Sequence, residues 1–454
     1  MTNAILCGKS HAGNPHVRFD DGEIGTVTRR GVLRGLLTTG AGCLFGQSAE
    51  AGSPEPGNIA ATRWERGQFQ AHFIYTGVSE SIFIIFPDGT SMLLDCGDCP
   101  AIMRKPYNVP VPRPCEMAGE TVANYVLGVN PHGSHVDYMV VSHFHADHVG
   151  TPNWQNCGVL VDKSKGRYWR SGFGIALEKL HFSNAIDRGF PTYDDPIPFV
   201  DGSDRELEHM KRIYDFLRER DGLKVEKFQV GSNDQIRMLH GGTEDFRVRN
   251  LAANGKVAKL NGSVHDFARD FLSRHPGARF DENRMSIGMV FEFGDFRFYS
   301  AGDFMGWDDL DRAMANAVGR VDVAKMDHHG CYSMSRNLVA ALRAKCYIGC
   351  VWCQLHALDE TMKRLSDKSL YPDERFLFPT VLTSERRAKD RDKPWFADVS
   401  PGVSETGVHV ILTVQPGGGR YSMECVDSSD NQLKVLARHW FETNEKKGLG
   451  TDHP

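Results

Sequence analysis

The stretch VVSHFHADHVG, residues 140–150, places three histidines and an aspartate within six positions. With 19 histidines in 454 residues, the spacing H-x-H-x-x-H is expected by chance only about 0.03 times. Imidazole nitrogens and carboxylates are ligands of zinc, and of manganese or iron where more oxygens join them. We therefore predict that His143 and His145 bind one metal ion, while Asp147 and His148 point toward a second. A solvated, histidine-rich turn is the weaker explanation of this spacing.

The composition is that of a globular protein large enough for one α/β domain with insertions, or for two ordinary domains. Hydrophobic residues make up 41% and charged residues 24% of the chain, and the net charge is −5. A mildly acidic chain has no general attraction to nucleic acid. A nucleic-acid partner is therefore an option that charge does not favour, beside a small-molecule or phosphoester substrate.

The N-terminal segment resembles a twin-arginine export signal. Arg29 and Arg30 precede a weakly apolar, glycine-rich run over residues 31–45, and small residues follow up to Ala51. The run is too short to span a bilayer, so we expect a cleaved signal over residues 1–51, no transmembrane segment, and a periplasmic or secreted protein. A disordered basic tail is the alternative. An oxidising compartment permits disulfides, but free buried thiols are an equal alternative for the close pairs Cys96/Cys99 and Cys350/Cys353.

The rest of the chain alternates short apolar runs with helical patterns. Turn residues predict hairpins around 87–89, 294–295 and 417–419, and an apolar strand over 136–141 leads into the histidine cluster. The segment over about 151–239 is less regular and contains one amphipathic helix, so we interpret it as an insertion that shapes a cleft. Residues 431–454 are expected to form a C-terminal tail.

The ordered motifs resemble those of one enzyme superfamily. H-x-H-x-D-H after an apolar strand is similar to the signature of metallo-β-lactamases, and LLDCGD at 93–98 is similar to their first motif. Residues 282–304 and the segment VDVAKMDHHGCYS at 321–333 resemble the hydrolase domain of ComEC-type DNA-uptake proteins and their soluble relatives. The resemblance covers roughly residues 69–426, and it implies an αβ/βα four-layer sandwich over about 60–430.

The resemblance also implies roles for individual residues. It implies that His143 and His145 bind the first ion and that Asp147 and His148 bind the second. Asp303 is implied to bridge both ions. One of His328 and His329 completes the second site, and the motif does not decide which. The remaining implied roles concern Asp95, which is expected to hydrogen-bond a ligand, and His356, which is expected to contact developing negative charge.

Three departures from the family pattern affect the prediction. The family's G-Q-G-D loop is replaced by GVSES at 77–81, and Asp327 stands where a small or apolar residue is usual. A third histidine for the first ion is not evident either. The histidines in the relevant interval, none in a convincing context, are His240, His265 and His275.

The resemblance predicts an exported hydrolase with two divalent metal ions, zinc before manganese or iron, that share an activated hydroxide. Asp147 is the expected proton acceptor. The aspartate at 303 and the ComEC-like motifs favour a phosphodiester or other phosphoester substrate. The alternatives are a lactone or β-lactam hydrolase of the same superfamily, although its classical β-lactamases carry Cys or His at that position, and a non-catalytic periplasmic metal-binding protein.

Overall fold

The computed structural model describes residues 60–99, 110–112, 117–151, 167–198, 204–242, 245–277, 281–305, 308–353 and 356–444. The expected signal segment, residues 1–51, lies outside these ranges. Among the described residues, no helix combines the length and the apolar character needed to cross a bilayer.

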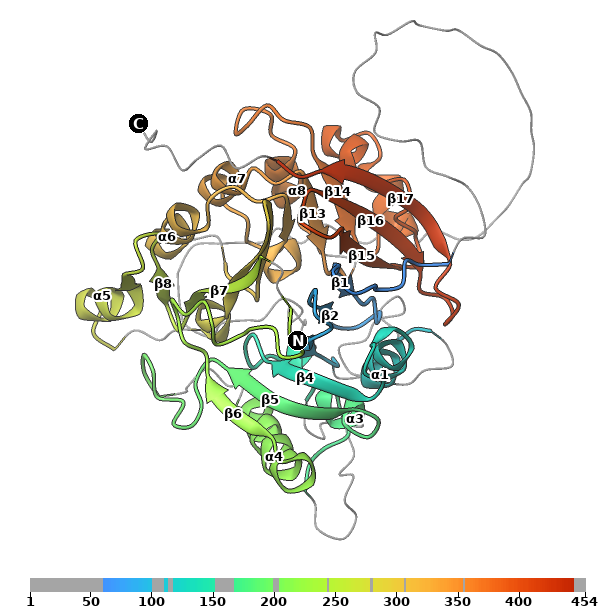
Figure 1. Ribbon diagram of the computed structural model, residues 1–454. Helices are drawn as coiled ribbons and strands as arrows, with labels where there is room; N and C mark the ends of the chain where they lie inside the picture. The colour runs from blue at the N-terminus through green and yellow to red at the C-terminus, as the bar shows by residue number, and fades with distance from the viewer. Residues whose placement is uncertain are drawn as a thin grey trace, which may run out of the picture.

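Two large sheets form the centre of the molecule (Figure 1). The first sheet has nine strands, in the order β17 (Val435–Glu442), β16 (Arg420–Asp427), β15 (Val408–Val414), β1 (Phe69–Phe73), β2 (Ser81–Ile85), β3 (Ser91–Cys96), β4 (His135–Val140), β5 (His181–Asp187) and β6 (Lys224–Lys227). The second has eight strands, in the order β14 (Phe376–Pro379), β13 (Cys346–Gly349), β12 (Val323–Lys325), β11 (Phe296–Ala301), β10 (Gly288–Phe293), β7 (Phe246–Ala253), β8 (Lys256–Ala258) and β9 (Val264–Asp266).

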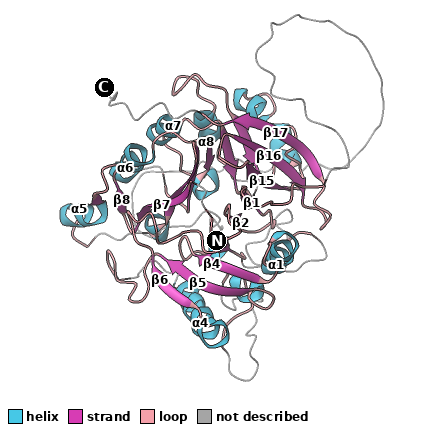
Figure 2. Cartoon of the chain, in the orientation of Figure 1, coloured by secondary structure: helices cyan, strands magenta, loops and turns pink. Residues whose placement is uncertain are grey.

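Helices cover the outer faces of these sheets, as the colours of Figure 2 show. The described α-helices are α1 (Ala118–Val129), α2 (Ala146–Val149), α3 (Phe173–Ala176), α4 (Asp204–Asp221), α5 (Phe267–Arg274), α6 (Asp308–Val318), α7 (Arg336–Leu342), α8 (Asp359–Leu365) and α9 (Ser384–Asp390). Short 3-10 helices span Glu282–Met285, Asp327–Gly330 and Pro394–Asp398.

Alternating side chains divide the interior into three apolar layers. Along β2, Ile82 and Ile84 point into the layer between the two sheets, whereas Phe83 and Ile85 pack with α1 and α4 on the other face. Successive side chains of a strand point to opposite faces, so a strand buried on both sides is apolar throughout. A third apolar layer lies between the second sheet and helices α6 and α7. The expected αβ/βα four-layer sandwich is therefore confirmed.

Two boundaries differ from the sequence prediction. The segment over 151–239 contributes two strands to the nine-stranded sheet, since β5 pairs parallel with β4 and β6 pairs parallel with β5, and α4 packs on that sheet. It is thus part of the sandwich rather than an insertion. Residues 435–442 form the edge strand β17, paired antiparallel with β16, instead of a tail. The pattern VLARHWFE buries only alternate residues, and such a half-exposed edge strand has a weak hydrophobic signal.

The described cysteines, including both close pairs, are all buried. Cys96 and Cys350 are free thiols, so neither Cys96/Cys99 nor Cys350/Cys353 is joined by a disulfide.

Two buried histidines make the fold sensitive to acid. Burial lowers the pKa of His409 on β15 to about 3, and burial together with His409 lowers that of His72 on β1 to about 3. Both rings are neutral in the folded chain, whereas the unfolded chain protonates them below about pH 6.5. Stability is therefore lost as the pH falls from about 6.5 toward 3, by about 1.4 kcal/mol per pH unit for each histidine.

Urea unfolding between pH 7 and pH 4 checks this expectation. His409 Nδ1 accepts a hydrogen bond from the Tyr75 N–H at 3.1 Å, and the carbonyl of an asparagine can replace that acceptor. We expect His409→Asn to reduce the pH dependence of the free energy of unfolding by the contribution of one titrating group, about 1.4 kcal/mol per pH unit. An unchanged slope would show that His409 is not a source of the acid sensitivity.

Candidate metal centre

Four strands carry the predicted site residues to one edge of the sandwich. Asp95 lies in β3, and the histidine cluster begins three residues after β4, which runs parallel to β3. Asp303 follows β11, and His328 and His329 follow β12, which runs parallel to β11. The ends of parallel strands meet at the same edge of a sheet, so chain segments far apart in sequence converge here.

The loop with the histidine cluster is held tightly against the end of β3. Asp95 Oδ1 accepts from the Ser142 N–H at 2.8 Å, and Asp95 Oδ2 accepts from the Ser142 hydroxyl at 2.6 Å. At Gly97 a Cβ atom would lie 1.8 Å from the carbonyl oxygen of Asp147. Only glycine allows this close approach, which sets the height of the loop above the sheet.

Asp303 is the central carboxylate of the site. Its Oδ2 lies 3.3 Å from His148 Nε2, 3.4 Å from His329 Nε2 and 3.8 Å from His143 Nε2. Its backbone N–H donates to Ser286 Oγ at 2.9 Å, and its Oδ1 has no hydrogen-bond partner although it is buried. Asp303 thus faces histidines from both halves of the site, as a ligand shared by two ions must.

Two histidines of the cluster form one side of the centre. His143 is fully buried, and its Nε2 lies 3.1 Å from Nδ1 of the half-buried His145. The hydroxyl of Ser142 lies 3.0 Å from His143 Nδ1, which leaves Nε2 directed toward His145 and Asp303.

His329, rather than His328, joins Asp147 and His148 on the other side. His329 Nε2 lies 3.0 Å from Asp147 Oδ2, whereas His328 Nε2 lies 3.9 Å from Asp303 and 3.4 Å from the Asn283 amide. Both histidines have a left-handed backbone, with φ of 47° and 53°, and this rare conformation turns consecutive side chains in different directions.

Asp95 lies behind a histidine of the cluster. Its Oδ2 accepts from His148 Nδ1 at 2.8 Å, so that Nε2 of the same ring faces Asp303. Hydrogen bonding of one ring nitrogen to a carboxylate fixes the tautomer and orientation of a metal-binding histidine. Asp327, in contrast, accepts a hydrogen bond from the Tyr299 hydroxyl at 2.9 Å.

His356 lies against the cluster without facing Asp303. Its ring stacks on that of His329, with centroids 4.9 Å apart and planes inclined by 11°, and Trp352 packs edge-on against it. Burial lowers the pKa of His356 well below the ordinary imidazole value, so the ring is neutral.

The other histidines considered for the first ion lie elsewhere. His240 bonds Asp137, His265 pairs with Asp270, and His275 stacks on Phe271.

Glu80 is part of the site and was not predicted. One ligand atom each from Glu80, His148, Asp303 and His329 lies within 4.8 Å of the others, and all four residues are buried. Glu80 belongs to the loop 77–81, whose sequence departs from the family motif. The available signal was the acidic residue retained in that loop, directly before an apolar strand.

The electrostatics of the centre favour positive charge beside Asp303. Burial alone would raise the pKa of Asp303, but His148 and His329 hold it well below its ordinary value. Conversely, burial would lower the pKa of these two histidines, but the surrounding carboxylates, Asp303 foremost, raise it well above the usual value. Divalent cations can supply the same charge in place of those protons.

The donor set fits divalent cations. Imidazole nitrogens and carboxylate oxygens converge, and two of these atoms, His148 Nε2 and Asp303 Oδ1, are buried without a hydrogen-bond partner. Buried polar atoms without a partner are rare in folded proteins and often mark the place of an ion or water.

A cavity of about 560 Å³ lies along the same edge of the sandwich, where β5, β6 and β7 end. Its walls are partly aromatic, from Phe190 and Phe228, and partly basic, from Lys227 and Lys256, which share the carboxylate of Asp195. Among the described residues, its lining contains none of the clustered histidines.

A chain of hydrogen bonds joins this cavity to the histidine loop. Asn254, which lines the cavity, accepts from Arg188 at 3.2 Å. Arg188 forms two bonds of 2.6 Å to Glu282, and Glu282 accepts from the Phe144 N–H at 3.0 Å, between His143 and His145.

Comparison with known proteins gives only distant structural likenesses. No model of a known protein family matches the sequence, and no curated protein matches it. A protein from Parabacteroides distasonis, assigned as a metal-dependent hydrolase, is 14% identical, with a TM-score of 0.32 and with 68% of this chain and 92% of that chain covered. Zinc-bound PqqB from Methylobacterium extorquens is 12% identical, with a TM-score of 0.31 and coverage of 73% and 87%. The nature of the site is therefore inferred from the geometry of its own side chains.

Proposed function

We propose that this chain is a hydrolase that uses two divalent cations to cleave a phosphoester, with a phosphodiester as the preferred substrate. The observation that carries the proposal is the central carboxylate, Asp303, with histidines from both sides of the centre directed at one of its oxygens. A single structural ion would need only one such group of ligands.

The first cation would be held by His143 and His145, the second by Asp147, His148 and His329, and both by Asp303. When bound, the two cations lower the pKa of water to about 7 and neutralise charge on the attacking and leaving oxygens. Zinc is the preferred metal because imidazole nitrogens predominate, with manganese or iron as alternatives.

The chain's own residues orient the reaction. Asp147 has its Oδ2 at the border of the centre, 3.0 Å from His329 Nε2, where it accepts the proton released by water. His356 stacks behind His329 and keeps that ring in place. Its ring also packs edge-on against Trp352, and contact with developing negative charge stays its predicted role.

Two features support a phosphodiester over other substrates. The shared position is occupied by aspartate rather than by the Cys or His of the β-lactamase relatives. The neighbouring cavity, whose walls include Lys227 and Lys256, gives room for the second ester arm. Lactone or β-lactam hydrolysis and a non-catalytic metal-binding role remain the competing functions.

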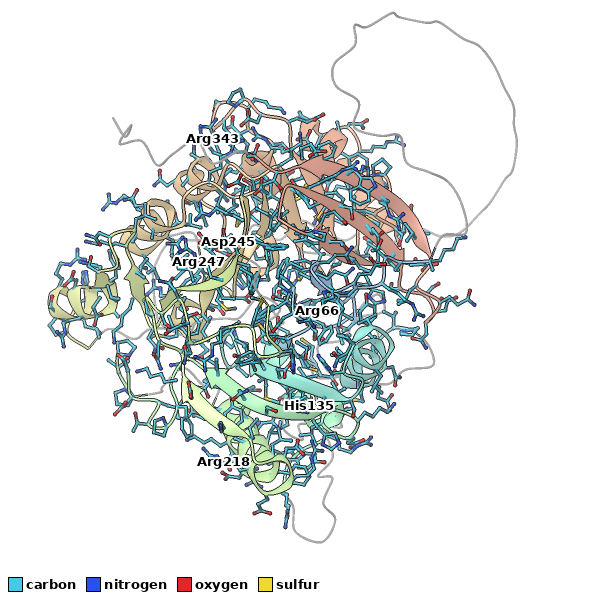
Figure 3. The ribbon with its side chains drawn as sticks, viewed as in Figure 1. Arg66, His135, Arg218, Asp245, Arg247 and Arg343 are labelled. Carbon is cyan, nitrogen blue, oxygen red and sulfur yellow. The ribbon has the colours of Figure 1, made fainter. Side chains whose placement is uncertain are left out.

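A long nucleic acid is not the favoured substrate. Arg218, Arg247 and Arg343, labelled in Figure 3, come from separate elements. Each is paired with an acidic side chain, namely Asp215, Glu292 and Asp373. Pairing of this kind weakens the attraction of a surface for a polyanion.

We also propose that the protein acts after twin-arginine export, on the basis of its N-terminal sequence.

Metal analysis combined with an activity screen tests the proposed function. We expect about two divalent ions per purified chain, and hydrolysis of a model phosphodiester that is lost on chelation and restored by zinc or manganese. Phosphomonoester, lactone and β-lactam compounds serve as comparison substrates. Cleavage of the carbonyl compounds alone would refute the phosphoester assignment, and bound metal without turnover would favour the non-catalytic alternative.

A further inference from the structure

Glu80 is a buried acid between a buried lysine and a histidine of the metal centre. It is 1% exposed, its Oε1 lies 2.9 Å from Lys325 Nζ, and its Oε2 lies 3.2 Å from His329 Nδ1. Lys325, in β12, is itself fully buried. A buried acid and base of opposite charge compensate each other, so Glu80 can remain ionised in the interior.

The backbone of Glu80 is fixed to the two segments that carry Asp147 and Asp95. The Glu80 N–H donates to the carbonyl of Asp147 at 2.9 Å, and the Glu80 carbonyl accepts from the Gly97 N–H at 3.2 Å. The side chain therefore starts from a position defined by the histidine loop and by the end of β3.

Lys325 connects Glu80 to the segment that carries Asp303. Its ammonium group donates to the carbonyls of Ala301, at 2.7 Å, and Gly302, at 3.4 Å. These carbonyls directly precede Asp303. The Lys325 ammonium thus occupies Glu80 Oε1 and leaves Oε2 to face His329.

The side of His329 that Glu80 faces is the one directed away from Asp147 and Asp303. His329 Nδ1 donates to the Cys350 carbonyl at 3.0 Å, with Glu80 Oε2 at 3.2 Å, while Nε2 of the same ring faces Asp147 and Asp303. A carboxylate on Nδ1 keeps the proton on that nitrogen and leaves the lone pair of Nε2 for a cation. Asp95 likewise lies on the Nδ1 side of a cluster histidine, where its Oδ2 accepts a hydrogen bond from His148 at 2.8 Å.

We propose that Glu80, held by Lys325, is a positioning residue that prepares His329 to bind the second cation. This role presupposes the two-cation centre proposed above. The negative charge of Glu80 near Nδ1 also makes Nε2 of His329 a stronger ligand for the cation. The neutral Cys350 carbonyl alone would have a smaller effect. The loop that departs from the family motif therefore retains a function in metal binding.

Replacing Glu80 by glutamine tests the proposal, because the side chain keeps its size and loses its charge. The metal-free full chain is titrated with Zn²⁺ against a competing chromophoric chelator. We expect Glu80→Gln to bind the second cation about 10- to 100-fold more weakly than the wild type and the first cation equally well. The visible spectrum of the Co²⁺-loaded protein should change only at the second equivalent.

Glu424→Gln is the matched control. Glu424 on β16 is fully buried and paired with the base Arg438, as Glu80 is with Lys325, but it lies in another part of the sheet. We expect this variant to bind both cations like the wild type. Equal weakening in both variants would mean that loss of any buried acid disturbs the fold, and it would overturn the proposal.

A double variant covers the case in which Glu80→Gln, with an unpaired buried Lys325, does not fold. Glu80→Gln/Lys325→Met removes both charges and should show the same selective loss of the second cation. Wild-type affinity for that cation in either variant would overturn the role of Glu80. A wild-type chain that binds only one cation would instead refute the proposed function.

Discussion

Replacing Asp303 by asparagine is expected to abolish turnover while the fold is retained. The Asp303 Oδ2 lies within 3.9 Å of imidazole nitrogens from four histidines, and asparagine offers those nitrogens, and any cations they hold, only a neutral amide. Removal of a residue that merely supports a metal ligand lowers metal affinity or activity by roughly 10- to 100-fold. The loss of a ligand common to both ions should therefore reduce kcat/KM by more than about 100-fold.

The matched control for this prediction is Asp327→Asn. Burial raises the pKa of Asp327 well above its ordinary value, so the acid is neutral, and an asparagine oxygen can still accept from Tyr299. We expect this variant to retain turnover. Metal content and the circular dichroism melting curve accompany the kinetics for both variants. Turnover by Asp303→Asn at the wild-type rate would exclude a shared-ligand role.

Replacing Arg188 by methionine should cause the largest loss of stability. Arg188 and Glu282 are 4% and 1% exposed, and they form a two-point ion pair in the interior. Removal of one partner leaves a charge buried without compensation, which typically costs about 3–5 kcal/mol. The free energy of unfolding, measured in urea at pH 7, should fall by this amount.

A surface pair provides the comparison for Arg188. Arg391 and Asp392 are 72% and 93% exposed and 3.9 Å apart, and exposed pairs contribute roughly 0–1 kcal/mol. Arg391→Met should accordingly leave stability almost unchanged. Because Glu282 also accepts from the Phe144 N–H, Arg188→Met should weaken metal binding as well. A loss no greater than that of Arg391→Met would show that Glu282 is protonated or solvated.

The features that could be predicted from sequence are those encoded over short distances. The H-x-H-x-D-H spacing lies within six residues, and the hairpins of β2–β3, β10–β11 and β15–β16 have glycine at their turns. These local patterns, together with the family resemblance, were sufficient to predict the four layers and the convergence of most site residues.

The features that were missed depend on contacts between distant segments. Glu80 acquires its environment only when β12 brings Lys325 and His329 beside its loop. The difference between His328 and His329 depends on left-handed backbone angles, which residue type alone does not predict. The strand β5 was assigned to an insertion because its pairing partner, β4, lies across a long intervening segment.

The pairing of β1 with β15 has a consequence for biosynthesis. Phe69 lies opposite Val414, so β1, the first described strand of the sheet, finds this neighbour only after all the residues up to β15 have been synthesised. Until then β1 presents an unpaired edge, which nascent chains expose to aggregation. Completion of the sheet is consequently a late and slow event, and chaperones are expected to protect this edge until β15 has been synthesised.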